Sequence, residues 1–130
     1  MNQQAFLKSI NPLIPGGDNL EKTVVFYEQK LGFKRIHQEG EAIYMAIVER
    51  DSVRLFLLKN GDKHLAEGTS LRINVVQIEK LYSEFEDKDT EIIDPNGKLE
   101  TKPWGMKEFA ILDPAGVCIT FCESANDNSD

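Results

Sequence analysis

Two cysteines and two histidines are the side chains in this sequence best suited to bind a metal ion or act as nucleophiles. Cys118 and Cys122 are four residues apart in a segment expected to form a β-strand. At roughly 3.3 Å per residue their Cα atoms would lie about 13 Å apart. That separation is too long for a disulfide or for chelation of one metal ion. With no neighbouring base to activate either sulfur, we expect two partly buried, unreactive thiols.

The histidines offer no recognisable catalytic arrangement. His37 and His64 belong to different segments of the chain, and surface or structural roles are favoured over metal binding for both. The sequence also lacks a Gly-x-Ser-x-Gly nucleophile turn and a glycine-rich phosphate loop with its lysine.

The single tryptophan stands in a turn, within KPWGMKEFAILDPAG at residues 102–116. Pro103 fixes its own backbone and restricts Lys102 to extended geometry, while Gly105 permits a sharp bend. A loop restrained in this way can hold the Trp104 indole outward at little entropic cost, as a platform on which a flat ring can stack. The alternative is that Trp104 folds back over the core, since large aromatic side chains are mostly buried.

Composition limits the partners of the protein. A chain of 130 residues suits one domain. With 22 acidic and 15 basic residues the net charge is -7, which argues against nucleic acid as a partner. An acidic surface attracts cations, although it can equally serve solubility alone. No membrane span or secretion signal is recognised, so we expect a cytoplasmic protein with no membrane partner.

The elements that must position these residues form two similar halves. A short apolar strand, a helix and three strands are expected in each half, and "LEK" at Leu20 corresponds to "IEK" at Ile78. In the first half the helix covers 20–31, with Asn19 or Asp18 as its cap and Gly32 as its stop. The expected strands lie near 9–14, 33–39, 42–49 and 53–59 in the first half, and at 70–76, 90–94, 106–112 and 117–123 in the second, whose helix covers 78–88.

Together the halves predict an α+β fold in a single domain covering 1–130. The first module covers approximately 8–60 and the second approximately 69–124, and 125–130 is expected to be a disordered tail. One half has too few strands to cover both faces of its sheet. Two paired halves would give a curved sheet with helices on one face and a concavity on the other.

Two segments, LEKTVVFYEQKLGF and FAILDPAGVCITF, resemble the vicinal oxygen chelate superfamily. Within it, PWGMKEFAILDPAGVCITF is most similar to the bleomycin-resistance proteins. The resemblance implies paired βαβββ modules that form a cup-shaped mixed sheet with helices on its outer face. The superfamily contains metalloenzymes, such as glyoxalases and dioxygenases, as well as metal-free binding proteins.

The resemblance also indicates which positions would hold a catalytic metal. Its metal ligands project from the first and last strands of each half, and the matching positions here are Asn11 or Pro12, Phe56, Ser70 and Thr120. Phe cannot coordinate a metal, and Asn and Ser are poor ligands for zinc or iron. We therefore expect neither a metal nor another cofactor, and no catalytic residue.

The cup-facing residues follow from strand alternation. Phe56 and Tyr44 are the candidates in the first half, and Phe33, just after the helix, could add a second aromatic wall or pack beneath the helix. In the second half Ser70, Arg72 and Asn74 share one face. The positive charge of Arg72 would repel a cationic ligand. Arg72 therefore either pairs with an acid such as Glu108 or indicates an anionic ligand. The candidate ligand-binding residues are Trp104, Phe56, Tyr44, Phe33, Arg72, Asn74, Ser70 and Thr120.

The resemblance implies a protein that sequesters a planar, cationic small molecule in a groove at the interface of a homodimer. Pro12 and Pro15, around the first strand, could form the hinge for exchange of the N-terminal strand between subunits, or they could block edge-to-edge aggregation. The alternatives are a metal-dependent lyase, isomerase or dioxygenase of the same superfamily, and an interaction module without a small ligand.

Overall fold

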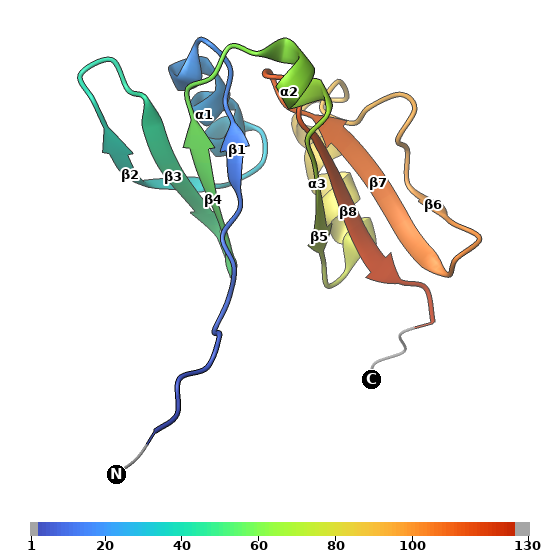
Figure 1. Cartoon of the computed structure of the whole chain (residues 1–130). Coiled ribbons are helices and arrows are strands. Elements are labelled where there is room, and N and C mark those ends of the chain that lie inside the picture. Colours follow the sequence, from blue (N-terminus) through green and yellow to red (C-terminus); the bar gives the residue numbers. More distant parts are fainter. Residues whose placement is uncertain (1–2, 127–130) are drawn as a thin grey trace.

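The computed structural model describes residues 3–126. Two four-stranded sheets, each with one long helix packed against it, make up the body (Figure 1). The first sheet has the order β1-β4-β3-β2 and the second the order β5-β8-β7-β6. The elements are β1 (Leu13–Pro15), α1 (Leu20–Gln29), β2 (Lys34–Glu39), β3 (Met45–Arg50), β4 (Val53–Leu58), α2 (Lys63–Glu67), β5 (Ser70–Asn74), α3 (Ile78–Lys88), β6 (Glu100–Thr101), β7 (Met106–Leu112) and β8 (Cys118–Ser124).

The predicted α+β fold is confirmed, with one difference in the sheet. The eight strands divide between two hydrogen-bonded sheets instead of forming one continuous sheet. In each sheet the first strand of the half pairs in parallel with the last, β1 with β4 and β5 with β8. The two sheets splay apart below α2, which connects them (Figure 1). The curved, open arrangement predicted from the paired halves is therefore present.

The first helix begins where the sequence indicates. The side chain of Asn19 accepts a hydrogen bond from the Lys22 N–H at 3.1 Å, so Asn19 and not Asp18 is the cap. Leu20, Val24 and Tyr27 are buried against the first sheet, as their spacing predicts. The helix ends two residues before the predicted limit, and Gly32 has a φ of +77°, which favours glycine.

The strand predicted at 90–94 is wrong. Ile93 makes only an isolated bridge to Ile111, and the strand that pairs with β7 on this edge is β6, at Glu100–Thr101, which reaches only Lys107 and Glu108. Between them the chain turns, because the Gly97 N–H donates to the Asp94 carbonyl at 2.7 Å. Here Gly97 approaches Ala110 so closely that a Cβ at Gly97 would lie 2.8 Å from the Ala110 Cβ. The apolar residues Ile92 and Ile93 made the segment TEIID look like a strand. In the structure both are buried, but they belong to an irregular segment at the edge of the sheet.

The short helix α2 was not predicted. It lies in the segment expected to be a loop between the halves, and its N-terminus is capped by Asp62, whose side chain accepts from the Leu65 N–H at 3.1 Å. Ala66 is its buried residue. Five residues are too few to show helical periodicity in the sequence.

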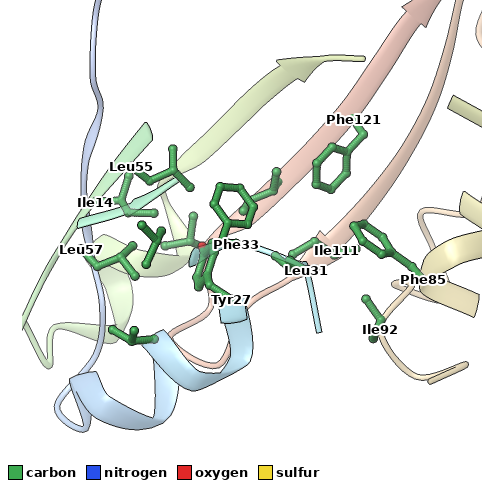
Figure 2. Close-up of a cluster of buried hydrophobic side chains, with 14 of the residues drawn as sticks. Ile14, Tyr27, Leu31, Phe33, Leu55, Leu57, Phe85, Ile92, Ile111 and Phe121 are labelled. Atoms are coloured by element: carbon green, nitrogen blue, oxygen red, sulfur yellow. The ribbon is translucent and has the colours of Figure 1, made fainter. Parts of the chain in front are cut away.

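One hydrophobic core lies between the helices and the sheets, and it joins the two halves (Figure 2). Leu55 and Leu57 point into it from the first sheet, and Ile119 and Phe121 from the second. The opposite face of the second sheet, turned away from α3, is called the open face below.

The N-terminal residues form an arm. Residues 3–12 have no regular structure and extend away from the body (Figure 1). Phe6, Leu7 and Ile10 on this arm are almost fully exposed. At the other end, the Ala125 N–H donates to the Gly105 carbonyl, and residues 127–130 of the predicted tail lie outside the described residues. Among residues 3–126, no helix has the length and apolar character that crossing a bilayer requires.

Candidate ligand-binding site

The open face of the second sheet brings together residues that are far apart in the chain. In β5, Ser70, Arg72 and Asn74 alternate with the partly buried Leu71 and Ile73. Strand register places Arg72 beside Thr120, and Asn74 in line with Cys122 and Glu108. The shared face predicted for the three polar residues of β5 is thus present in the structure.

Trp104 lies at the tip of the β6–β7 hairpin. The Gly105 N–H donates to the Lys102 carbonyl at 2.9 Å, and the Lys102 N–H donates to the Met106 carbonyl at 2.7 Å. With Gly105 at a φ of +86°, this is a tight three-residue hairpin loop closed by a glycine bulge. The Trp104 side chain is 64% exposed, so it does not cover the core of the described chain.

The indole is held in place by a carboxylate. Trp104 Nε1 donates to Glu108 Oε2 at 2.8 Å. The same oxygen accepts from Arg72 Nη2 at 2.6 Å, while Arg72 Nη1 lies 3.4 Å from Oε1. Glu108 is only 5% exposed, and the hydrogen bond from Arg72, followed by that from Trp104, holds the pKa of its carboxyl below 4.5 against the opposing effect of burial. The Arg72–Glu108 pairing considered from the sequence is therefore present, and it fixes Trp104 as well.

Cys122, the strand neighbour of Glu108, carries a buried thiol. Cys122 is buried, and its Sγ donates to Asn74 Oδ1 at 3.4 Å. Burial raises the pKa of the Cys122 thiol, which disfavours the nucleophilic thiolate. Cys118 is half-buried in the same strand, and both cysteines are free. The expectation of partly buried thiols agrees with these positions.

The other aromatic candidates are not on this face. Phe33 is buried in the core, edge-on to Tyr27, which is the packing alternative considered from the sequence. Tyr44 lies exposed just before β3, outside the strand in which it was expected. Phe56 projects from the first sheet on the face away from α1, opposite Leu13 in register. The structure thus groups Trp104, Arg72, Asn74, Ser70 and Thr120, with Glu108 as the added member.

Two cavities of the described chain lie away from Trp104. A cavity of about 480 Å³ lies between the two halves, and its lining includes the core residues Phe33 and Phe121 as well as Asn74. A smaller one of about 290 Å³ lies by the start of α1. Trp104 lines neither of them. A single copy therefore offers Trp104 as a surface platform and not as the wall of a pocket.

The positions expected to bind metal in a metalloenzyme do not fit that role. Phe56 is next to Leu13, and Thr120 is next to Arg72, so apolar and cationic groups stand where oxygen or nitrogen ligands would be needed. Across residues 3–126, no group of three or more His, Cys, Asp or Glu side chains is placed so that it could hold a metal ion. His37 and Glu39, which have His-x-Glu spacing on β2 and were not among the candidates from the sequence, are in contact through Nε2 and Oε2. The pair is exposed on the surface.

The sequence matches a known protein family. The family model of the Glyoxalase/Bleomycin resistance protein/Dioxygenase superfamily matches residues 10–121. The chain belongs to this superfamily. The resemblance seen in the helix and hairpin segments is therefore confirmed.

The superfamily relatives most similar in sequence include bleomycin resistance proteins. Those of Geobacillus stearothermophilus and Staphylococcus aureus are 32% identical to this chain over 133 aligned residues, covering 88% of this chain and 95% of theirs. Among solved structures, the bleomycin-binding protein of Streptomyces verticillus complexed with copper(II)-bleomycin is 26% identical, with a TM-score of 0.74 over 91% of this chain and 97% of that one. A bleomycin resistance determinant encoded on the transposon Tn5 shares the fold, at 20% identity and a TM-score of 0.75 over 91% of this chain and 98% of that one.

Proposed function

We propose that this protein binds and sequesters a planar, cationic small molecule by stacking it on Trp104, without chemical conversion and without a metal. The observation that carries the proposal is the hydrogen bond from the Trp104 indole to the buried Glu108 carboxylate. It holds a largely exposed aromatic face in one orientation, in a loop already closed by two backbone hydrogen bonds. An indole that is ordered before binding loses little entropy when a flat ring stacks on it.

The relatives support this type of ligand. They are bleomycin resistance proteins and a bleomycin-binding protein. The net charge of -7 favours the approach of a cationic molecule. We propose the cytoplasm as the place of action, because both cysteines are free.

We further propose that the binding groove forms between two copies of the chain. Trp104 lines neither of the two cavities described above and is largely exposed, so a second copy would supply the facing wall. The N-terminal arm offers the means of association, because Phe6, Leu7 and Ile10 are exposed apolar side chains that a partner subunit would cover. The exposed Leu13 and the half-buried Phe56 add apolar surface to the first sheet next to the base of this arm.

The experiment is a titration of tryptophan fluorescence with metal-free bleomycin at low and moderate salt. Because the chain has one tryptophan, the signal reports on this loop alone. Saturable quenching at about two ligands per dimer is expected, and weakening with salt would reflect the acidic surface. Equilibrium dialysis of Trp104→Ala should show binding reduced by about tenfold or more, whereas Tyr44→Ala, an exposed aromatic away from the site, should bind as the wild type does. Unchanged fluorescence up to high micromolar bleomycin would exclude this ligand.

A further inference from the structure

The open face beside Trp104 has hydrogen-bond donors that the fold leaves accessible. Arg72 carries five N–H groups, and its Nη1 and Nη2 atoms are directed at Glu108. The Arg72 side chain is 53% exposed, and the contacts with Glu108 use only two of its five N–H groups. These contacts hold the guanidinium in place, so its remaining donors have a defined position.

Asn74 is oriented in the same way. Its Oδ1 accepts from the Cys122 thiol at 3.4 Å, which leaves the two N–H groups of Nδ2 for another partner. Asn74 is exposed and lies two residues from Arg72 on the same face of β5. The side chains of Ser70 and Thr120, which flank Arg72 on this face, add hydroxyl groups. The exposed polar surface is thus rich in donors.

The acids near this surface are already compensated. Glu108 is buried and bound by Arg72 and Trp104. Glu100, its neighbour on β6, has its Oε2 3.4 Å from the Lys102 ammonium. The local charge is therefore close to balanced, in contrast to the acidic molecule as a whole.

The guanidinium of Arg72 and the indole of Trp104 are held close together because both bond to the same oxygen atom of Glu108. Trp104 Nε1 and Arg72 Nη2 both bond to Oε2 of Glu108. A ring stacked on Trp104 would therefore place its own substituents next to the guanidinium. A carboxylate attached directly to an aromatic ring has the reach and the paired oxygens that a guanidinium binds best.

We propose that Arg72 and Asn74 form an anion subsite that binds a carboxylate, sulfonate or phosphate group carried by the planar ligand. This inference rests on the proposed function, because it requires a ring on Trp104. It is compatible with a ligand of positive net charge, since long-range attraction depends on the whole surface whereas the subsite binds one group. Arg72 and Asn74 are then the residues that determine specificity among planar ligands.

The test compares three flat probes on the ¹⁵N-labelled protein: naphthalene-2-carboxylate, naphthalene-2-carboxamide and N-methylquinolinium. The single indole N–H signal reports stacking on Trp104, and the Arg72 Nε–H signal reports the subsite. In the wild type, the carboxylate should bind about tenfold more tightly than the carboxamide, the value of a charge-assisted hydrogen bond. It should also shift the Arg72 signal.

The variants separate the subsite from the platform. Arg72→Met should reduce the carboxylate-to-carboxamide ratio to about one, and Asn74→Ala should reduce the ratio about threefold, as expected for a neutral donor. Arg54→Met is the matched control, because Arg54 pairs with Glu49 on the other sheet and should not affect the ratio. Arg72→Lys keeps the charge without the paired donors and should give an intermediate ratio.

Two outcomes would overturn the inference, and they are distinguishable. If N-methylquinolinium shifts the indole signal while the wild type binds carboxylate and carboxamide equally, the subsite is wrong and the proposed function stands. If Arg72→Met keeps the carboxylate-to-carboxamide affinity ratio of the wild type, the conclusion is the same. If no probe shifts the indole signal, both the subsite and the stacking platform are wrong.

Discussion

The hydroxyl of Tyr27, in α1 of the first half, donates a 2.7 Å hydrogen bond to Oδ2 of Asp113 in the second half. The residues are 86 positions apart, and both are buried. Oδ1 of Asp113 accepts from the backbone N–H groups of Ala115, Gly116 and Val117, so one carboxylate organises the β7–β8 turn and connects it to α1. Burial, the largest effect, raises the pKa of Asp113 above 3.8, and these hydrogen bonds oppose it.

Tyr27→Phe should destabilise the protein by about 1–3 kcal/mol, because it leaves a buried carboxylate oxygen without its donor. The measurement is urea denaturation followed by circular dichroism. Tyr44→Phe, which removes a hydroxyl from an exposed tyrosine, should change the free energy of unfolding by less than about 0.5 kcal/mol. Equal stability of the two variants would show that the Tyr27–Asp113 contact does not couple the halves.

Acid should release Trp104 from Glu108. The pKa of Glu108 is lowered in the folded protein, so its ionised form stabilises the fold above pH 4.5 and this contribution is lost as the pH falls through the lower folded value. The indole N–H signal should therefore shift with a midpoint below pH 4.5, before the far-ultraviolet circular dichroism changes. Arg72→Met should move this midpoint upward, because it removes the hydrogen bond that contributes most to the lowered pKa of Glu108. A midpoint that Arg72→Met leaves in place would contradict the role given to the ion pair.

Replacement of Gly105 should disturb the Trp104 loop. Gly105 has a φ of +86°, and a Cβ there would meet only Asn126 Nδ2 at 3.8 Å, so the cost of Gly105→Ala is one of backbone conformation. We expect a loss of about 1 kcal/mol in stability and weaker ligand binding. Gly105→Asn should lose less, since asparagine tolerates the left-handed region better. Thermal unfolding of both variants makes the comparison, and an alanine variant as stable as the wild type would contradict it.

Polar substitution on the arm should weaken association of two copies. Leu7 is fully exposed in the single chain, and Leu7→Asp should raise the dissociation constant of a dimer about tenfold or more, the value of one buried apolar side chain. Sedimentation equilibrium measures this constant. Val76→Asp is the control, because Val76 is an equally apolar, exposed residue outside the arm. A wild type that sediments as a monomer would exclude the proposed groove between subunits.

Much of the site was accessible from the sequence because it depends on local rules. Strand alternation placed Ser70, Arg72 and Asn74 on one face, and the proline and glycine around Trp104 predicted a tight turn. The charge of Arg72 suggested pairing with an acid such as Glu108 as one of two alternatives, and the structure contains this pair. Periodicity failed where elements were short or irregular, as in α2 and in the segment at 90–94.

By itself, the sequence determined the superfamily, the two-module order and the start of α1, since each depends on residues close together in the chain. Only the tertiary structure decided that Phe33 lies in the core, that the strands divide between two sheets, and that Glu108 holds Trp104 and Arg72 on a single oxygen. These features depend on contacts between residues that lie far apart in the sequence and meet only in the folded chain. Arg72 and Glu108, for example, are 36 positions apart. The secondary-structure propensities of short segments do not predict such contacts, because the free energy that favours them comes from burial and from pairing across strands.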